Sequence, residues 1–543
     1  MGVLQTLNAH GKNMTPTQIS TLDILKLSII GILAIPFLWI LVDYVKVLRL
    51  RRKMPPGPFP LPLFGNYFTI EKVKPWLQFE RWAKEYNDPM ITIWQGHRPT
   101  IMCNDIWTIS DLLDKRASIY SSRPHMIAMG SSEGDTHDEH TAVGTQAVRP
   151  LRHIQANESK ILVRDLMDKP EDFVLSIERY STSVVSIIGW GRRIDKINDY
   201  VGQLALQVME GVDLIIPGLF IVESIPLLAR LPKLLNWLYP WPRATLDMSR
   251  HMQRYFAALS KEGAAMPEDN FAKRLYKEQE ASRGLSLSDA EIATLTSNLI
   301  GGGVDTTSGT LIAFILAMCV FRDVQGKAQA ELDGVVGQSR VPDWTDESSL
   351  PYVKAMISEV LRWRTVTILG GIPHAPIQDD EYRGYFIPKG TPITGNVWAI
   401  HRHPREFPDP DTFRPERYLG GSGSGSGLER PYPNKQGHNA FGWGRRACSG
   451  QPLAEQGLFM TIATLLWAFD IRPGLDEKGN ELQLDTSIDA FTKSENMRPE
   501  PFKARFIPRS KEVEQILRDE ATRARRELTV FDGETRLTME NVP

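Results

Sequence analysis

Cys448 stands in the stretch with the most distinctive chemistry, FGWGRRACSG at residues 441–450. The three glycines of this stretch permit tight turns and the close approach of a flat ligand. An apolar helical segment follows, so the N–H groups of its first turn and two arginines favour the thiolate form of the cysteine. A thiolate in such surroundings is suited to act as a nucleophile or as a metal ligand, whereas a lone cysteine elsewhere is usually a small core residue.

A second stretch carries glycines in the middle of a predicted helix. The apolar pattern from residue 288 to about 320 predicts a long helix, with Ser288 and Glu291 as a capping box at its start. Because apolar residues run nearly all round this helix, we expect it to be buried. Gly301–Gly303 each cost about 1 kcal/mol relative to alanine, so another group should approach the backbone there. The polar residues that follow argue against a membrane span.

The composition places these stretches in a globular protein. The chain has 543 residues, of which 42% are hydrophobic and 24% are charged, with a formal net charge of −2. Nucleic-acid binding usually needs a strong basic excess, so no nucleic-acid partner is expected. Three widely spaced cysteines without a CxxC pattern disfavour zinc and a disulfide scaffold, and favour a reducing compartment. The Gly/Ser run at residues 420–427 is a flexible loop or a sequence added by cloning.

Most of the chain has helical spacing, with a few short segments of alternating pattern. The alternation in residues 90–104 breaks at Gly96, which predicts a β-hairpin. Short strands with turns at Gly384 and Gly390 are expected further along, after a helix that begins at Pro351. The predicted fold class is therefore mainly α with small β-sheets, an α+β protein.

The N-terminal segment differs from the rest of the chain. Residues 27–42 carry no charge, and with their flanks they reach the ~20 residues that a membrane-spanning helix requires. The basic cluster at residues 46–53 predicts that this end stays in the cytosol. A cleaved signal peptide is disfavoured, because the basic cluster follows the apolar run and no small-residue cleavage site does. The PPGP sequence at residues 55–58 cannot continue a helix and forms a stiff connector.

The stretch around Cys448 fits the pattern F-x-x-G-x-R-x-C-x-G and resembles the heme-binding signature of the cytochrome P450 family. Further motifs of that family occur in its order along the chain: GGVDTT at residues 302–307, EVLR at 359–362 and FRPERY at 413–418. The N-terminal segment is similar to that of microsomal members, and the whole pattern to fungal members that tailor secondary metabolites. The resemblance covers roughly residues 20–510. It implies the cytochrome P450 fold, a single large domain with an N-terminal transmembrane helix.

The resemblance implies roles for particular residues. Cys448 would be the axial thiolate ligand of the iron in heme b, a ligand that favours O–O cleavage. Asp305 and Thr306 match an acid and an alcohol that supply protons, with hydrogen bonding to the preceding turn as the alternative for Thr306. An ordinary half-buried histidine is the alternative for His374. The residues implied to bind heme are Phe441, Gly444, Arg446, Cys448, Gly450 and His374.

Two further sets of residues follow from the resemblance. Glu359, Arg362 and Arg417 match a buried Glu-Arg-Arg network, with a surface ion pair worth about 0–1 kcal/mol as the alternative for the first two. The substrate pocket is expected near Met126 and in two largely apolar stretches, Asn298–Gly302 and Val366–Ile372.

One departure from the family concerns its heme contacts. Members usually carry W-x-x-x-R on a helix after the first third of the chain, but residues 131–141 read SSEGDTHDEHT. Arg149 or Arg152 is a candidate substitute, and we expect weaker heme binding than in members with the intact helix. The alternatives to a monooxygenase are a heme-thiolate isomerase or dehydratase, and a defective member of the family.

The function implied is that of a cytochrome P450 monooxygenase, an oxidoreductase that inserts one oxygen atom from O₂ into a lipophilic small molecule in secondary-metabolite biosynthesis. Electrons would come from NADPH through NADPH–cytochrome P450 reductase. The implied location is the endoplasmic reticulum membrane, crossed once, with the catalytic domain in the cytosol. The expected domains are a lumenal N-terminus (1–20), a transmembrane anchor (21–47), a basic and proline-rich hinge (48–62), a heme-thiolate catalytic domain (63–510) and a charged C-terminal tail (511–543).

Overall fold

The computed structural model describes residues 21–126, 145–210, 213, 216–230, 241–281, 287–419 and 432–542. Three predicted features lie outside these residues: the lumenal segment 1–20, the stretch 131–141 that lacks W-x-x-x-R, and the Gly/Ser run at 420–427. The chain divides into two units, of which the first ends at Arg52 and the second begins at Lys53. The second unit is one body, mostly helical with small sheets, as the sequence predicts.

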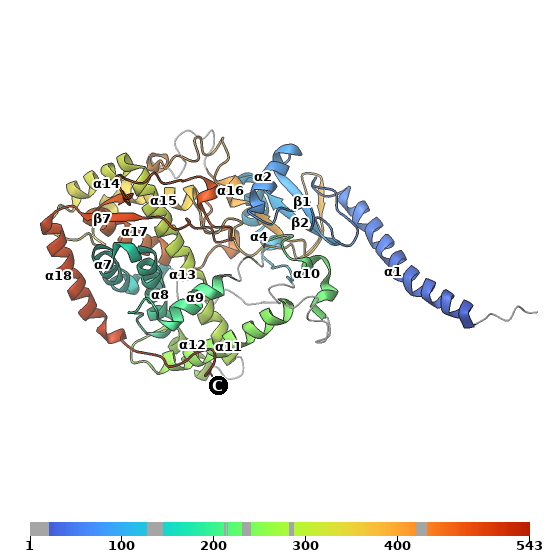
Figure 1. Ribbon diagram of the computed structural model, residues 1–543, viewed down its shortest axis with the longest axis horizontal. Helices are drawn as coiled ribbons and strands as arrows, with labels where there is room; N and C mark the ends of the chain where they lie inside the picture. Colours follow the sequence, from blue (N-terminus) through green and yellow to red (C-terminus); the bar gives the residue numbers. More distant parts are fainter. Residues whose placement is uncertain are drawn as a thin grey trace, which may run out of the picture. The chain divides into compact units, whose positions relative to one another are not determined.

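Helices form most of this body (Figure 1). Pro351 occupies the first turn of α15, as predicted. The described helices are α1 (Thr21–Arg51), α2 (Pro75–Glu85), α3 (Ile106–Ser110), α4 (Ala117–Tyr120), α6 (Thr145–Val148), α7 (Arg152–Asp168), α8 (Phe173–Trp190), α9 (Tyr200–Glu210), α10 (Ile221–Ser224), α11 (Trp241–Ala265), α12 (Phe271–Ala281), α13 (Asp289–Val320), α14 (Arg322–Val335), α15 (Pro351–Trp363), α16 (Val397–Ile400), α17 (Gln451–Ala468) and α18 (Lys511–Glu527).

The described strands form small sheets, in the orders β1-β2-β5, β3-β4 and β6-β7. The hairpin predicted around Gly96 is confirmed: β1 and β2 pair antiparallel, and Gly96 has a φ of 60° in the turn. Gly384, with a φ of 80°, forms the turn between β3 and β4. The strands are β1 (Met90–Gln95), β2 (Arg98–Cys103), β3 (Asp380–Tyr382), β4 (Tyr385–Ile387), β5 (Ile393–Gly395), β6 (Phe469–Pro473) and β7 (Ala504–Pro508).

The long helix α13 runs through the body, packed against α8, α9, α11 and α17 (Figure 1). Its predicted capping box is confirmed, since the Ser288 hydroxyl accepts from the Glu291 N–H and the Glu291 carboxylate accepts from the Ser288 N–H at 2.7 Å. Among the residues whose side chains the structure describes, which exclude the first part of α1, this one helix is long and apolar enough to cross a membrane, and 78% of its apolar window is buried in the body. α13 is therefore a core helix.

The glycines of α13 have different surroundings. A Cβ added at Gly303 would lie 2.5 Å from Cγ2 of Val185, so this glycine lets α13 approach α8 closely. A Cβ at Gly302 would meet no atom of the described chain within 4 Å. Close packing between helices therefore accounts for one of the three glycines, while another borders open space.

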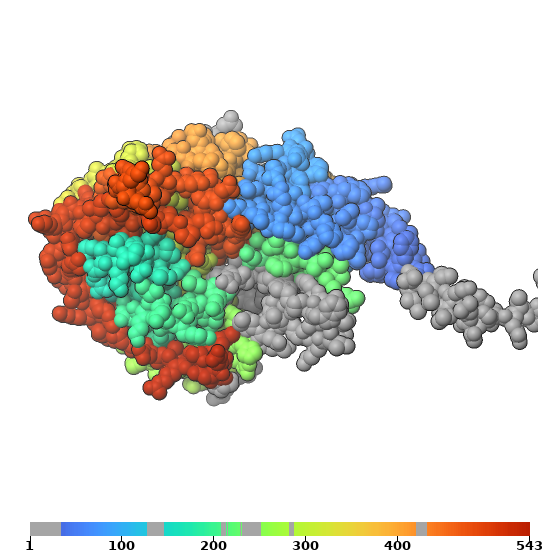
Figure 2. Space-filling view, viewed as in Figure 1, coloured from blue at the N-terminus to red at the C-terminus, as the bar shows by residue number. Residues whose placement is uncertain are grey.

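The C-terminal segment is part of the packed body. Val513, Leu517, Ala521 and Ala524 form a buried stripe on α18, which packs against α7. Leu528 and its neighbours extend this packing beyond the helix. Figure 2 shows the red C-terminal atoms bordering the teal surface of α7 and α8. The segment is a surface helix as predicted. The prediction of a loose tail after it is wrong at Leu528 and Phe531, which are buried against the body.

The first unit consists of α1, whose side chains are described from Ala34 onward. Ile35, Phe37, Leu38 and Trp39 follow one another around Pro36, and each is more than half exposed. Soluble proteins rarely leave such a run of large apolar side chains uncovered.

Candidate active site

The loop that carries Cys448 is fixed by its own backbone and by the segment before α4. The Cys448 N–H donates to the carbonyl oxygen of Phe441 at 2.8 Å, which closes the turn. Gly444 has a φ of 57°, and a Cβ there would lie 2.1 Å from the carbonyl oxygen of Leu113. The Gly444 N–H donates to Oδ1 of Asp114 at 2.6 Å. The loop therefore requires glycine at this position, and it ends shortly before the start of α17.

Of the three cysteines, all within the described residues, Cys448 is the exposed one. Burial raises the pKa of Cys103 well above its ordinary value, and it raises the pKa of Cys319 to about 12. A thiolate is the form of cysteine that binds a metal ion. Cys448 is thus the cysteine placed to act as a ligand.

His374 and Arg446 both contact the segment that ends α4. Nδ1 of His374 lies 2.9 Å from the carbonyl oxygen of Tyr120, and Nε of Arg446 donates to the carbonyl oxygen of Ser121 at 2.9 Å. Burial, followed by the charges of Arg123 and Arg446, lowers the pKa of His374 to about 4, against the hydrogen bond to the Tyr120 main chain. The imidazole is therefore a neutral donor at physiological pH, held beside two guanidinium groups.

Arg123 is a heme-site candidate that sequence reasoning missed. Its Nη1 donates to the carbonyl oxygens of Ile372 and Pro373. Burial, followed by the charge of Arg446, lowers the pKa of Arg123 to about 10. Its position in the sequence could have pointed to it, because Arg123 lies just upstream of the stretch that lacks W-x-x-x-R.

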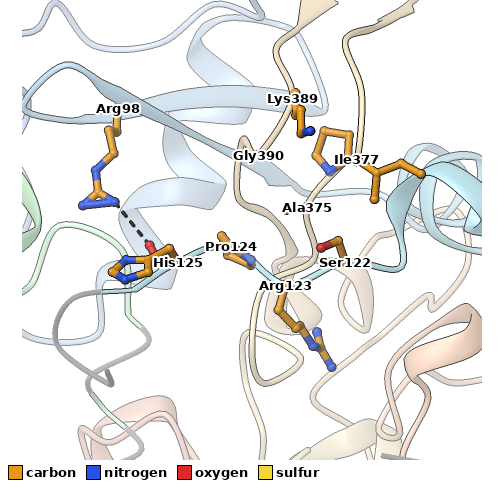
Figure 3. A pocket seen from close by; sticks show the side chains of 10 residues that line it. Arg98, Ser122, Arg123, Pro124, His125, Ala375, Ile377, Lys389 and Gly390 are labelled. Carbon is orange, nitrogen blue, oxygen red and sulfur yellow. Dashed lines mark hydrogen bonds between the residues drawn. The ribbon is translucent and has the colours of Figure 1, made fainter. Parts of the chain in front are cut away.

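The side chains of Arg98 and Arg123 extend in different directions beside a cavity (Figure 3). A cavity of about 430 Å³ is lined in part by Arg98, Arg123, His125 and Lys389. In Figure 3 the Arg98 side chain reaches toward His125, to whose carbonyl oxygen it donates, while the Arg123 side chain extends away from both. The Arg123 guanidinium is close enough to Arg446 for that charge to act on the pKa of Arg123, and close enough to the neutral His374 to lower the pKa of that imidazole.

The donor set fits the acidic edge of heme. Arg123 and His374 hydrogen-bond main-chain carbonyl groups, and neither forms an ion pair with a carboxylate of the described residues. Two propionates would supply the negative charge that such a cluster favours, through charge-assisted hydrogen bonds. Arg152, a candidate for that role from the sequence, instead pairs with Glu347 at 3.1 Å.

On α13, Thr306 and Gly302 lie one turn apart, beside the open space described above. The Thr306 hydroxyl donates to the Gly302 carbonyl oxygen, which is the alternative that the sequence left open for this residue. The hydroxyl therefore caps a carbonyl group that borders the open space.

The Asp305 side chain is turned toward another part of the chain. Its Oδ2 accepts from Nδ2 of Asn496 at 2.8 Å, and its Oδ1 lies 3.8 Å from Nη1 of Arg498. Burial raises the pKa of Asp305, while the amide of Asn496 and the charge of Arg498 oppose that rise. The structure therefore places Asp305 with Asn496 and Arg498, two residues that the sequence gave no reason to single out.

The segment Ser494–Arg498 also holds the expected pocket wall. The Ile368 N–H donates to the Glu495 carbonyl oxygen at 3.1 Å, and the Met497 N–H donates to the Val366 carbonyl oxygen at 2.8 Å. The buried carboxylate of Glu495 accepts from the Leu369 N–H at 3.0 Å. The segment Ser494–Arg498 thus holds both the stretch Val366–Ile372, which is expected to contact substrate, and the carboxyl group of Asp305 on α13.

Glu495 makes the stability of this region depend on pH. Burial raises its pKa from 4.5 to about 8, against the main-chain hydrogen bonds from Leu369 and Gly371, and Asp213 adds to the rise. The folded protein therefore holds a proton that the unfolded chain releases, so stability falls as pH rises from about 4.5 to about 8. The slope from this group is about 1.4 kcal/mol per pH unit.

Glu495→Gln is expected to remove that slope. Urea unfolding of both proteins across the window should show the wild type losing stability relative to the variant as pH rises. Glu481→Gln, at an exposed carboxylate paired with Arg505, serves as the control and should keep the wild-type slope. Parallel stability curves for the wild type and Glu495→Gln would contradict the expectation.

The structure brings Glu359, Arg362 and Arg417 together inside the body. Nε and Nη2 of Arg362 donate to the two oxygens of Glu359 at 2.8 Å each, and both side chains are 0% exposed. Nε of Arg417 lies 3.4 Å from the same carboxylate. Burial disfavours the charge on Arg362, but Glu359 outweighs it and raises the pKa of the guanidinium. The ion pair is buried, unlike the surface pair that the sequence left as an alternative.

Comparison with known proteins places this fold and the motif around Cys448 in a family of enzymes. The family model described as Cytochrome P450 matches residues 55–495. Cytochrome P450 monooxygenase 58 of Postia placenta is 32% identical over 90% of this chain and 94% of its own length. Tryptamine 4-monooxygenase of Psilocybe cyanescens is 32% identical over 87% and 96%. Cytochrome P450 monooxygenase virE of Hypocrea virens is 34% identical over 89% and 90%.

The chain belongs to the cytochrome P450 family. It is an oxidoreductase with the role of a monooxygenase, as the motifs around Cys448 predict. Membership implies a heme-thiolate iron, and members of the family generally act on small molecules with electrons from a reductase.

Proposed function

We propose that Cys448 is the axial ligand of heme b in a membrane-anchored monooxygenase that oxidises a lipophilic secondary metabolite. The observation that carries this proposal is the exposed thiol of Cys448 on a loop closed by its own main chain, together with Arg123, a basic side chain that pairs with no carboxylate of the described residues and whose pKa is lowered by burial and by Arg446 of the same loop. When bound, heme with a thiolate ligand supplies the activation of O₂ and the transfer of one oxygen atom.

Different residues of this chain would bind the propionates, leave room for O₂, supply protons and shape the loop. Arg123 and Arg446 hold the propionates by charge and hydrogen bonding, and the neutral His374 lies beside these two guanidinium groups. Gly302 leaves room beside α13, and Thr306 and Asp305 hold and pass on protons that the reduction of O₂ consumes. Phe441, Gly444 and Gly450 shape the loop on the thiolate side.

The substrate class follows from the expected pocket and from the relatives. The wall formed by Val366–Ile372 is largely apolar, which favours a lipophilic molecule. One relative is named for tryptamine, and virE is another fungal monooxygenase. We propose a role in fungal secondary metabolism, with electrons delivered from NADPH by NADPH–cytochrome P450 reductase.

α1 is proposed as a single transmembrane anchor in the endoplasmic reticulum membrane. Its 31 residues would span about 46 Å as a helix, more than the ~30 Å of a bilayer core. Its described apolar side chains are exposed, and basic residues occupy its last turn, which keeps the catalytic body in the cytosol. The lumenal position of residues 1–20 belongs to the same proposal.

The reduced, carbon-monoxide-treated absorbance spectrum tests the proposal. Thiolate ligation is expected to give the red-shifted Soret band that is the hallmark of the family, whereas a protein without any heme band would be a defective member. NADPH consumption that yields an oxygenated product would exclude an isomerase or dehydratase. Comparing metabolites of a strain that lacks the gene with those of its parent would then identify the substrate.

Arg123→Leu is expected to speed heme loss roughly tenfold or more, because a hydrogen bond to a charged group contributes about 1.5–3 kcal/mol. The measurement is the rate of heme transfer from the purified protein to a scavenger globin. Arg98→Leu is the matched control, because Arg98 borders the same cavity but pairs with Glu223 at 3.1 Å. Equal rates of heme loss for the two variants would show that Arg123 does not bind heme.

A further inference from the structure

Arg498 is shared by two buried carboxyl groups, one of which is Asp305. Its Nη1 lies 2.7 Å from Oε1 of Glu178 on α8 and 3.8 Å from Oδ1 of Asp305 on α13. We propose that Arg498 is a positioning residue for Asp305, and that its exchange between the two carboxylates controls when Asp305 carries a proton. The proposal rests on the proposed function, in which Asp305 supplies protons.

The exposure of these side chains shows which of them connects the pair to water. The side chain of Arg498 is 34% exposed, whereas those of Glu178 and Asp305 are 9% and 12% exposed. Arg498 therefore stands between solvent and two carboxyl groups that are themselves largely shielded. A shift of its guanidinium changes both the charge beside Asp305 and the access of water to it.

Asp305 has one fixed oxygen and one that is loosely held. Nδ2 of Asn496 donates to Oδ2 at 2.8 Å, and Asn496 is in turn held through its own carbonyl oxygen by the Thr367 hydroxyl at 3.3 Å. The other oxygen faces Arg498 at a distance longer than a hydrogen bond. This second oxygen is the one whose protonation Arg498 would govern.

The surrounding charges make that control effective. Asp213 adds negative charge beside Asp305, while the single guanidinium of Arg498 faces the two carboxyl groups of Glu178 and Asp305. Burial raises the pKa of Glu178, and Asp305 raises it further, while Arg498 lowers it. The pKa of Asp305 is therefore higher when Arg498 pairs with Glu178, and lower when Arg498 pairs with Asp305.

The proton balance is simple and involves no change of oxidation state within the cluster. Asp305 takes a proton from water at the Arg498 edge and gives it up toward the face of α13 that carries Thr306. Arg498 keeps its own proton throughout and acts by its position alone. Each cycle transfers one proton from solvent.

Two variants should move the pKa of Asp305 in opposite directions. Arg498→Met removes the cation and should raise the pKa of Asp305 by about one unit. Glu178→Gln removes the competing carboxylate, so Arg498 can pair with Asp305 alone and should lower that pKa by a similar amount. Arg498→Lys keeps the charge and should stay near the wild type. Arg505→Met is the matched control, because Arg505 is 32% exposed and lies 2.7 Å from Glu481.

Infrared difference spectra of the purified resting protein across pH measure this pKa without turnover, with Asp305→Asn assigning the carboxyl band. An Asp305 band that titrates alike in the wild type, Arg498→Met and Glu178→Gln would overturn the proposal. Thermal unfolding identifies any variant that does not fold. If Arg498→Met is one of them, the pKa of Asp305 is compared between the wild type, Arg498→Lys and Glu178→Gln.

Turnover then tests the consequence for proton delivery. The protein is mixed with a purified fungal NADPH–cytochrome P450 reductase and NADPH without added substrate, and the share of electrons recovered as hydrogen peroxide is measured across pH. We expect the midpoint of this profile to move with the infrared pKa, upward in Arg498→Met and downward in Glu178→Gln. Infrared shifts without matching profile shifts would overturn the control of proton delivery. A wild type without a thiolate Soret band would instead refute the proposed function.

Discussion

Replacing Cys448 with serine is expected to abolish the red-shifted Soret band of the reduced, carbon-monoxide-treated protein. Monooxygenase activity should fall at least about 100-fold, because even the outer partners of metal ligands are worth 10–100-fold. The physical reason is that a serine hydroxyl is not deprotonated where a thiol is, so no anionic sulfur donates electron density to the iron. The loop itself should survive, since its turn is closed by the main chain at residue 448 and by Gly444.

Cys319→Ala is the control for this substitution. Cys319 is buried in the main core on α13 and is far from the loop in sequence. Its loss should lower thermal stability by the cost of a small cavity and leave the Soret band in place. A Cys448→Ser protein that kept the thiolate band would show that another ligand holds the iron.

Glu359→Gln is expected to lower the free energy of unfolding by about 3–5 kcal/mol. The substitution leaves the guanidinium of Arg362 buried without its charge partner, while its other hydrogen bonds, to the carbonyl oxygens of His401 and Pro410, remain. Glu359 also accepts from the Arg414 N–H at 2.9 Å, so the segment that carries the P-E-R motif would loosen as well. Chemical unfolding of the purified protein measures the loss.

The exposed pair of Glu481 and Arg505 provides the comparison. Its N–O distance is 2.7 Å, close to the 2.8 Å of the buried pair, but both side chains are about a third exposed. Glu481→Gln should therefore cost only about 0–1 kcal/mol. Similar losses for the two variants would mean that burial does not set the strength of the Glu359 pair.

Features that depend on residues close in sequence could be predicted. The capping box of α13 joins residues three apart, the hairpin at Gly96 needs one positive φ, and Glu359 and Arg362 share one face of a helix. Each is specified by local geometry, so the residue pattern alone contains the information. The motif around Cys448 belongs with them, because one turn closes within eight residues.

Contacts between distant segments could not be predicted in this way. Arg123 meets His374 and Arg446 only after the chain has folded, and no spacing rule connects them. Asn496 and Arg498 reach Asp305 across about 190 residues for the same reason. Gly303 shows a further limit: its sequence position suggested room for a ligand, whereas the structure uses it to pack α13 against α8.

The C-terminal helix illustrates how charge can hide an apolar pattern. α18 has apolar residues four apart at Val513, Leu517 and Ala521, which is the spacing of a buried stripe. The many acidic and basic residues between them suggested a surface helix followed by a loose tail. Several of these charges form ion pairs with the body, among them Lys160 with Glu520 at 2.7 Å and Asp168 with Arg518 at 2.8 Å.

The packing of α18 also bears on how the protein is made. Val513 and Leu517 belong to the main core, yet they follow α7 and α8 by more than 300 residues along the chain. Translation adds about 5–20 residues per second, so α7 waits with an uncovered apolar face until α18 has been synthesised. We expect a chain that terminates prematurely before residue 511 to be retained by chaperones and degraded, even though it contains every residue proposed to contact heme.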